Sequence, residues 1–379
     1  MFRFEVRARA SDCAARTGVF TTPHGDVLTP AFMPVGTRGT VKGVLPRDLR
    51  ALGARMILAN AYHLHLRPGE ETVAKLGGLH ALMGWDGPIL TDSGGYQVFS
   101  LGHLAKVDDE GVTLRSVVDG AEVRLSPEKV VDIQRALGAD VAMAFDHCPA
   151  DPTDRASVAD ATARTRAWLA RCVARHRERG GEESGQALFG IVQGGAFEDL
   201  RRESVESALE HDLAGYAIGG VSVGEDREQM RTAVGAAAPL LPEGKPRYLM
   251  GVGMPEDFFD AVERGCDLFD CVTPTRHGRT HQAFTSGGTV NLRNTQWRED
   301  RSPLDADCDC PACERFSRGT LRHLCLSGEM LGAMLLTMHN LRFFHRLLER
   351  MRAAIAEDRL TALRREILPP MRGRAGNGS

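Results

Sequence analysis

Three aspartates stand at the ends of apolar segments or inside one, where a carboxylate is costly unless it has a partner or a function. Asp92 and Asp146 each close such a segment, and Asp270 lies within Leu268–Val272. An ionised carboxylate buried without a hydrogen bond or counter-charge is unfavourable, so these acids are candidates for chemistry. Two carboxylates can act as a nucleophile and a general acid/base, although Asp92 before Ser93 could by itself be a helix cap.

Glycine-rich segments surround these acids and other polar side chains. They are Asp92-Ser93-Gly94-Gly95-Tyr96-Gln97, Gln193-Gly194-Gly195 and Gly219-Gly220. Glycine lets a flat ligand approach the backbone and exposes N–H donors to it. No GxGxxG fingerprint or Walker loop is present, so a nucleotide cofactor is not indicated. The combination predicts a pocket for a planar, hydrogen-bonding substrate.

Three cysteines near the C-terminus, Cys308, Cys310 and Cys313, fall within six residues. In a reducing compartment such crowding is typical of a metal site, because Zn²⁺ takes three or four thiolate or imidazole ligands in a tetrahedral arrangement. The candidates for the fourth ligand are His323, Cys325, His339 and His345. His339 lies in the helical segment Glu329–Glu349, which could hold it rigidly. Because four protein ligands leave no position for water, the sequence predicts one structural zinc ion per chain.

Eight apolar segments of strand length recur, and helix-like segments separate most of them. The strand-like segments are Ala31–Val35, Arg55–Asn60, Pro88–Asp92, Asp140–Asp146, Ala187–Gln193, Tyr216–Val221, Arg247–Val252 and Asp267–Val272. Their continuous apolar character is typical of parallel strands buried on both faces. The helix-like segments are one between a Ser126 cap and Gly138, then Thr153–Arg179, Glu198–Glu210, Glu225–Ala238 and Pro255–Arg264. This alternation predicts an α/β protein, a (β/α)₈ TIM barrel, with a doubly wound open sheet as the alternative.

A barrel accounts for the positions of the polar residues, because its strands converge on one site at their C-terminal ends. Lys106–Leu125, with turns at Asp109-Glu110-Gly111 and Asp119-Gly120, is expected to be an inserted hairpin. We expect a catalytic barrel over residues 1–275 and a zinc-binding subdomain packed on it over residues 276–350. Residues 351–379 are expected to form a C-terminal helix and a tail that is disordered from Leu368 to Ser379.

The net charge of −3 hides an uneven distribution. From residue 271 onward there are 17 Arg, no Lys and 11 acidic residues, a balance of +6, whereas residues 1–270 carry 30 basic and 39 acidic residues, a balance of −9. Arginine suits phosphate contacts, but an ordinary solvated surface is compatible with the same composition. Met1–Ala10 lacks the apolar run of a signal peptide and no segment approaches a membrane span, so a cytoplasmic protein is expected.

The motifs resemble those of the tRNA-guanine transglycosylase family in order and spacing. The matching segments are Asp92–Gln97, Phe145-Asp146, Gly190–Gly195, Tyr248–Gly253 and Phe269–Val272, together with Cys308, Cys310, Cys313 and His339. The resemblance extends from about Phe4 to Leu348 and implies that His339 is the fourth zinc ligand. It implies a pentosyltransferase that exchanges guanine at the wobble position of GUN anticodons for 7-aminomethyl-7-deazaguanine in queuosine biosynthesis. Exchange with retained configuration requires two displacements through a covalent tRNA–enzyme intermediate.

The resemblance also implies a role for each matching residue. Asp270 would be the nucleophile and Asp92 the general acid/base. Asp146 would accept hydrogen bonds from the guanine edge, while Gln193 and the Gly220 N–H would donate to its carbonyl oxygen. The implied base-binding residues are Tyr96 and Met250, which would sandwich the base, and Ser93, Gly94, Gly95, Asp146, Cys148, Gln193, Gly219, Gly220 and Val221. The target base must leave its stack to enter this pocket.

The resemblance further implies tRNA contacts beside the nucleophile, which favours an RNA surface as the reason for the charge distribution. The implied RNA-binding residues are Gly251, Val252, Gly253, Met254, Pro255, Glu256, Asp257, Thr275, Arg276, His277, Gly278 and Arg279. Two positions depart from the family pattern. Thr280-His281 stands where Asn-Gly is expected, and Met254 where a basic or small residue is common.

The branch of the family is indicated by two features. Cys148 after Asp146 and the segment Gly220–Glu225 resemble the bacterial type, whose members act as homodimers around the zinc region. Val223 is larger than its counterpart in the eukaryotic type, so the pocket is expected to take guanine and the aminomethyl base but to exclude bulkier queuine.

Three other classes of protein remain as alternatives. A non-catalytic zinc-containing RNA-binding subunit would be expected to lose the nucleophile, yet Asp270 is present. A zinc-dependent RNA-binding module would need no carboxylates at strand ends. A barrel glycosidase would use two carboxylates but has no need of an arginine-rich, zinc-bearing C-terminal part.

Overall fold

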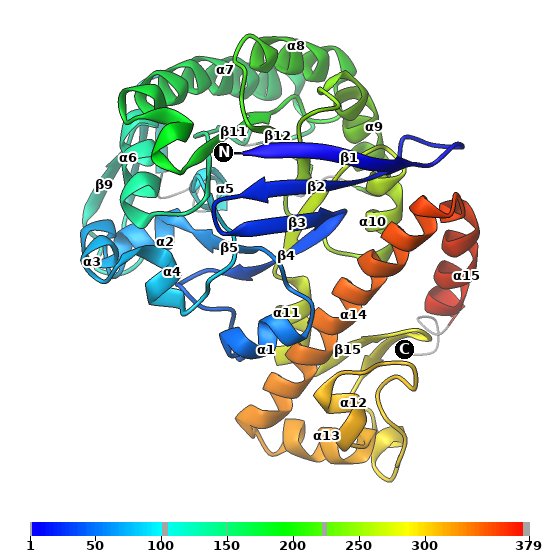
Figure 1. Ribbon diagram of the computed structural model, residues 1–379. Coiled ribbons are helices and arrows are strands. Elements are labelled where there is room, and N and C mark those ends of the chain that lie inside the picture. The colour runs from blue at the N-terminus through cyan, green and yellow to red at the C-terminus, as the bar shows by residue number, and fades with distance from the viewer. Residues whose placement is uncertain (1, 101–104, 150, 222–225, 374–379) are drawn as a thin grey trace.

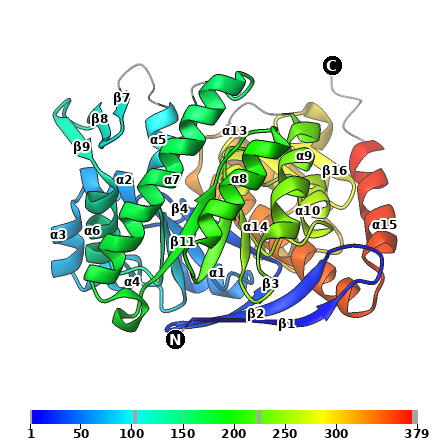
Figure 2. The ribbon, with the colours of Figure 1, turned by 90° about the horizontal axis from the view of Figure 1, so that it is seen from above.

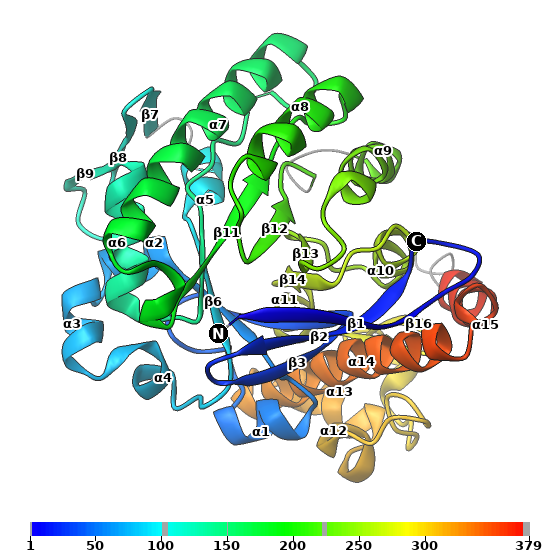
Figure 3. The same cartoon turned by 45° about the horizontal axis from the view of Figure 1, so that its top comes forward.

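Eight parallel strands close into a barrel in the computed structural model, which describes residues 2–100, 105–149, 151–221 and 226–373. The barrel strands are β4 (Ala31–Gly36), β5 (Ile57–Asn60), β6 (Ile89–Asp92), β10 (Val141–Met143), β11 (Ala187–Val192), β12 (Gly215–Ile218), β13 (Arg247–Leu249) and β14 (Leu268–Cys271). Their order around the barrel is β10-β11-β12-β13-β14-β4-β5-β6, so β14 pairs with β4 and β10 pairs with β6. Strands β6 and β11–β14 of the barrel are labelled in Figure 3. The predicted TIM barrel is confirmed, and closure of the sheet excludes the open doubly wound alternative.

Helices alternate with these strands and cover the barrel (Figure 1). They are α1 (Pro46–Ala51), α2 (Ala61–Leu66), α3 (Glu70–Lys75), α4 (Gly78–Met83), α5 (Gly95–Ser100), α6 (Pro127–Leu137), α7 (Arg155–Glu178), α8 (Glu198–Leu209), α9 (Arg227–Ala237), α10 (Pro255–Val262) and α11 (Thr273–Arg279). Helix α6 begins and ends as predicted. The Ser126 hydroxyl accepts a hydrogen bond from Lys129 N, and Gly138 ends the helix with a left-handed φ of 76°.

A three-stranded antiparallel sheet closes the N-terminal end of the barrel. It consists of β1 (Arg3–Arg9), β2 (Arg16–Thr22) and β3 (Gly25–Thr29). Phe20 and Val27, both fully buried, share a core cluster with the barrel residues Met33 and Leu58. Side chains from this sheet fill the N-terminal end of the barrel, so a ligand site is expected at the C-terminal end.

An inserted sheet lies at that opposite end (Figure 2). It consists of β7 (Ala105–Asp108), β8 (Gly111–Arg115) and β9 (Glu122–Leu125). The sequence predicts a two-stranded hairpin, whereas the structure has a three-stranded sheet. Both predicted turns are present. At the first turn Asp108 accepts from the backbone N–H groups of Glu110 and Gly111.

The C-terminal part packs beside the barrel. It contains the hairpin β15 (Gln282–Thr285) and β16 (Gly288–Asn291), then α12 (Pro311–Arg315), α13 (Arg318–Leu326), α14 (Met330–Ala356) and α15 (Leu360–Gly373). The prediction of disorder from Leu368 is wrong for residues 368–373, which continue α15. Leu363 and Leu368 are buried on that helix, and this packing outweighs the helix-breaking Pro369 and Pro370. No helix in the described part of the chain is both long and apolar enough to cross a bilayer.

Candidate active site and metal centre

The C-terminal ends of the barrel strands carry the polar residues singled out in the sequence. Asp92 ends β6, Asp146 follows β10, Gln193 follows β11, and Asp270 is the third residue of β14. Gly219 and Gly220 follow β12, and Met250 follows β13. Parallel strands in a barrel present these ends on one face, so the residues belong to one site.

Asp92 is held by two groups from the neighbouring strand end. Its carboxylate accepts a hydrogen bond from Ala61 N at 3.0 Å and another from the Asn60 side-chain amide. Burial raises the pKa of Asp92 to about 8, and the nearby charges of Asp270 and Asp146 add to that effect. At neutral pH this carboxyl group therefore retains its proton and can serve as a general acid.

Asp270 is held differently. Its Oδ1 atom accepts from the Tyr248 hydroxyl at 2.6 Å and from Gly251 N at 2.8 Å. Burial raises the pKa of Asp270 from its ordinary value, while the hydrogen bonds from Tyr248 and Gly251 favour the charged form and oppose that shift. Two donors fix one oxygen, which leaves the other free of these contacts to act as a nucleophile.

Asp146 lies at the centre of a hydrogen-bond network. Its Oδ1 accepts from Ser93 Oγ at 3.0 Å, and its Oδ2 accepts from Gln193 Nε2 at 2.8 Å and from Cys148 Sγ at 3.8 Å. Burial raises the pKa of Asp146, and these donors oppose the shift. Among the residues that the structure describes, the buried Oε1 atom of Gln193 has no hydrogen-bond partner. A buried orphan acceptor is costly, so this network is suited to rearrange around a polar ligand.

The glycines of the predicted pocket leave no room for side chains. A Cβ atom at Gly95 would lie 2.2 Å from Asp146 Oδ1, and one at Gly220 would lie 2.3 Å from Gln193 Oε1. Gly220 also has a left-handed φ of 60°. The buried Arg201 of α8 donates to Gly220 O at 3.0 Å, to Val192 O at 2.9 Å and to Gly195 O at 2.8 Å. One guanidinium thus fixes the backbone after two adjacent strands.

The two residues predicted to sandwich a base differ in exposure. Tyr96 lies on α5 with its side chain 54% exposed, and Met250 is partly buried against the inner core. Gly94, with a left-handed φ of 86°, lies against the Tyr62 side chain. Val221 is buried beyond β12, and Val223 lies outside the described residues.

The predicted RNA-binding segments follow β13 and β14. In the first, Glu256 and Asp257 at the start of α10 pair with Arg227, at 3.5 Å and 2.9 Å. In the second, Arg276 and Arg279 on α11 are exposed. Thr275 and Gly278 are buried on the same helix, and a Cβ at Gly278 would lie 2.6 Å from Thr337 N of α14. The second segment therefore presents its arginines outward and packs its small residues on α14.

His281 stands where the family pattern has glycine, and its backbone conformation is strained. Its φ of 67° is left-handed, which glycine adopts freely and histidine does not. The His281 ring accepts a hydrogen bond from Arg293 Nε at 3.0 Å, and burial together with Arg293 lowers the pKa of His281. The loop is therefore formed without glycine, with a side-chain contact offsetting part of the strain.

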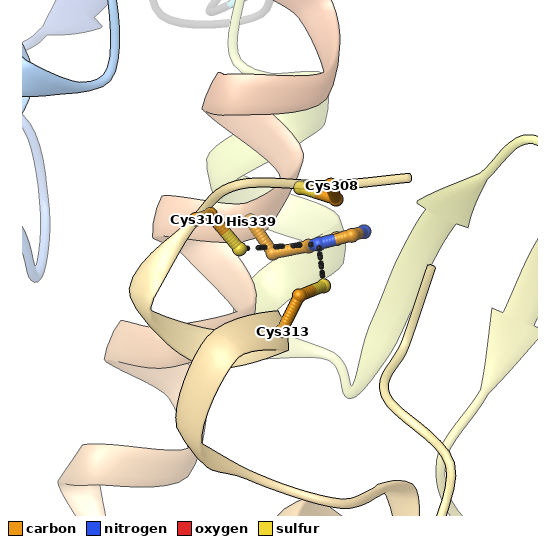
Figure 4. Close-up of side chains that lie close together, drawn as sticks. All are labelled: Cys308, Cys310, Cys313 and His339. Atoms are coloured by element: carbon orange, nitrogen blue, oxygen red, sulfur yellow. Dashed lines mark hydrogen bonds between the residues drawn. The ribbon is translucent and has the colours of Figure 1, made fainter. Parts of the chain in front are cut away.

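The predicted metal ligands come together in the C-terminal part (Figure 4). Their ligand atoms all lie within 4.8 Å of one another, and His339 Nδ1 is 3.5 Å from Cys310 Sγ and 3.2 Å from Cys313 Sγ. A tetrahedral ion with ordinary Zn–S and Zn–N bonds would separate sulfur and nitrogen by about 3.5 Å. His339 Nε2 faces Phe284 O at 2.6 Å, which orients Nδ1 toward the cysteines. The three thiols and one imidazole can hold a metal ion, whereas the other candidates, His323, Cys325 and His345, are outside the cluster.

Three residues of the site were not singled out in the sequence. Asn60 stands at a strand end as Asp92 does, and that position was a usable signal. Tyr248 lies within a buried strand and resembles a core aromatic residue. Arg201 lies on a helix with many charged residues and resembles a solvated side chain, so only the fold reveals its role.

These features define a TIM-barrel protein with paired carboxylates at its strand ends, the arrangement needed for displacement at a sugar carbon. A family model described as queuine tRNA-ribosyltransferase matches residues 11–372. The queuine tRNA-ribosyltransferase of Solidesulfovibrio magneticus is 53% identical over 356 residues, covering 94% of this chain and 95% of that protein. That of Thermus thermophilus is 52% identical over 365 residues, covering 96% and 93%. The chain belongs to the queuine tRNA-ribosyltransferase family, which confirms the resemblance drawn from the motifs.

Proposed function

We propose that this protein is a tRNA-guanine transglycosylase that exchanges guanine at the wobble position of GUN anticodons for 7-aminomethyl-7-deazaguanine. The observation that carries the proposal is the difference between two carboxyl groups on one face of the barrel. Asp92 is protonated at neutral pH, whereas Asp270 accepts from Tyr248 and Gly251 on one oxygen only. An acid and a nucleophile in one pocket are what a double displacement requires.

The reaction follows from these two groups. Asp270 attacks C1′ of the target ribose, the bond from C1′ to the base breaks, and Asp92 gives its proton to the departing guanine. The incoming base then gives its ring N–H proton to Asp92 and displaces the Asp270 carboxylate from C1′. Two inversions retain the configuration, and Asp92 returns to its protonated state.

Recognition of the base would use the network around Asp146. The N–H groups of the guanine edge would replace Ser93 and Gln193 as donors to its carboxylate, which in the free protein accepts from both. The Gln193 amide and the Gly220 N–H would then be available to the base carbonyl. The exposed ring of Tyr96 would close over the base, with Met250 beneath it.

Exchange of radiolabelled guanine in anticodon-stem RNA tests the proposal. Loss of label when the aminomethyl base is added, with no hydrolysis of a sugar oligomer, is expected. Queuine should not be incorporated, and Val223→Gly should relax that exclusion with little effect on guanine exchange. Absence of any exchange by zinc-loaded protein would favour the non-catalytic RNA-binding subunit instead.

The activity should depend on pH through Asp92. Because burial raises the pKa of Asp92 to about 8, kcat/KM for guanine release should fall by about tenfold per pH unit above that value. Asp92→Asn should remove most activity and with it this alkaline limb. A profile measured on labelled tRNA that stays flat to pH 9.5 would contradict the assignment of Asp92 as the acid.

The C-terminal part is proposed to carry one structural zinc ion per subunit, bound by Cys308, Cys310, Cys313 and His339. Four protein ligands leave none of the coordination positions for water, so the ion would stabilise the fold and take no part in the reaction. Together with the arginines of α11, this subdomain over residues 276–350 would contact tRNA beside the barrel over residues 1–275. The protein is proposed to act in the cytoplasm, where its tRNA substrates are.

A homodimer is proposed on an exposed apolar patch, defined as Leu45, Leu326, Met330 and Leu331, whose side chains are 47%, 50%, 81% and 44% exposed. The patch joins the end of α13 and the start of α14, and the backbone at Gly43 packs on Met334 of α14. Clustered apolar side chains of this kind are typical of protein interfaces.

A charge within the patch should therefore dissociate the dimer. Met330→Lys is expected to shift the sedimentation coefficient to that of a monomer at micromolar concentration. Leu240→Lys, which alters an apolar residue that is 39% exposed and lies outside the patch, is the control and should leave the dimer intact. Equal dissociation of the two variants would rule out the patch as the interface.

A further inference from the structure

Two histidines and an aspartate meet at the N-terminal end of the barrel, opposite the catalytic carboxylates. Asp140 immediately precedes β10, His24 lies in the turn between β2 and β3, and His80 lies on α4. Asp140 Oδ1 is 2.7 Å from His24 Nδ1, and its Oδ2 is 3.2 Å from His80 Nε2. Figure 2 shows that α4 and the N-terminal sheet lie at the end of the barrel away from β7–β9.

Asp140 is a buried carboxylate that a cation would stabilise further. Its side chain is 0% exposed. Among the described residues it pairs with His24 and His80 and accepts a hydrogen bond from Ile89 N, and no lysine or arginine pairs with it. The two imidazole rings stack with centroids 3.7 Å apart and planes 21° apart. Two charged imidazolium rings would repel in this arrangement, whereas one divalent ion bound by both rings would place its positive charge beside the buried carboxylate.

The positions of the three side chains suit a transition metal. Nitrogen and oxygen ligands on one tetrahedral ion lie about 3.3 Å apart when the metal–ligand bonds are near 2.0 Å. His80 Nε2 lies 3.2 Å from Asp140 Oδ2, close to this value, and His24 Nδ1 lies 2.7 Å from Asp140 Oδ1, so each carboxylate oxygen faces one ring. One ligand atom from each of the three residues lies within 4.8 Å of the others. His24 is 43% exposed in a hairpin turn, so its ring can turn away from the stack and leave the remaining coordination positions to water.

We propose that His24, His80 and Asp140 form a second metal site, for a divalent first-row transition ion bound by two imidazoles and one carboxylate. The donor set of nitrogen and oxygen suits Zn²⁺ or Ni²⁺ and differs from the thiolate set of the C-terminal cluster. The ion would link three segments that are far apart in the sequence, so it fastens the N-terminal sheet to the barrel.

Calorimetric titration with Zn²⁺ tests the site in protein that already holds one zinc ion per chain. The wild type should bind a second equivalent and show a higher melting temperature in its presence. His24→Gln should weaken this second event by at least about tenfold and remove the thermal shift, while the first zinc ion stays bound. His211→Gln, which alters a histidine outside the cluster, is the matched control and should bind as the wild type does.

His80→Gln gives the same test from a second element, in case substitution in the turn disturbs the hairpin. Absence of a second equivalent in the wild type would overturn the proposal. So would equal binding by the wild type, His24→Gln and His80→Gln, because the ion would then be held elsewhere on the surface.

Discussion

Asp270→Asn should abolish the covalent tRNA adduct and lower base exchange by roughly 10³-fold or more. The substitution keeps the shape of the side chain and leaves an oxygen that can still accept from the Tyr248 hydroxyl and from Gly251 N. What it removes is the second, negatively charged oxygen that would attack the sugar. The measurement is denaturing gel electrophoresis of labelled anticodon RNA incubated with protein free of deamidation.

Two further readouts separate a lost nucleophile from a damaged fold. Burial raises the pKa of Asp270, so the ionised group opposes folding at neutral pH, and the neutral variant should melt at the same or a higher temperature. Tyr248→Phe is the matched control. It removes one donor to Asp270 but retains the carboxylate, so it should form the adduct more slowly and still to completion. Adduct formation by Asp270→Asn at the wild-type rate would contradict the role of Asp270.

The sequence predicts the barrel well because its strands are buried on both faces. A segment such as Ala187–Val192 has no polar residue to interrupt it, and all six of its residues are buried in β11. The N-terminal sheet could not be predicted in the same way. In β2, buried residues alternate with partly exposed ones. What the sheet covers, the interior residues of the barrel, is set by tertiary contacts between segments far apart in the chain.

The residues of the candidate site also differ in whether their local sequence reveals them. Asp92, Asp146 and Asp270 were predictable because a carboxylate next to an apolar strand conflicts with burial. Two other residues of the site were not predictable, because neither side chain is unusual in its local sequence. Tyr248 donates to Asp270, and Arg201 donates to the backbone carbonyl of Gly220. Gln193 was predictable as a polar residue at a strand end, but its hydrogen bond to Asp146 is visible only in the structure.

Cys310→Ser should cost the protein its zinc ion and much of the stability of the C-terminal part. Cys310 is 1% exposed, and its sulfur lies 3.5 Å from His339 Nδ1. Structural zinc contributes on the order of 10 kcal/mol to the folding of small zinc domains. Part of this would remain here because α14 also packs on the barrel, so a lower melting temperature is expected rather than complete unfolding. Elemental analysis and calorimetric melting measure both effects, with Cys13→Ser, outside the cluster, as the control.

Loss of the zinc ion should affect the tRNA-binding surface more than the catalytic pocket. His339 and Thr337 both lie on α14, and Thr337 packs against Gly278 of α11. The exposed Arg276 and Arg279 lie on either side of Gly278 in the sequence. Disorder at the start of α14 would therefore displace α11, whereas Asp92 is held by Asn60 and Ala61 on the other side of the barrel. KM for tRNA should rise more than the rate of the first displacement falls. Zinc-free Cys310→Ser with unchanged melting temperature and unchanged KM would show that the cluster does not support the fold or the RNA surface.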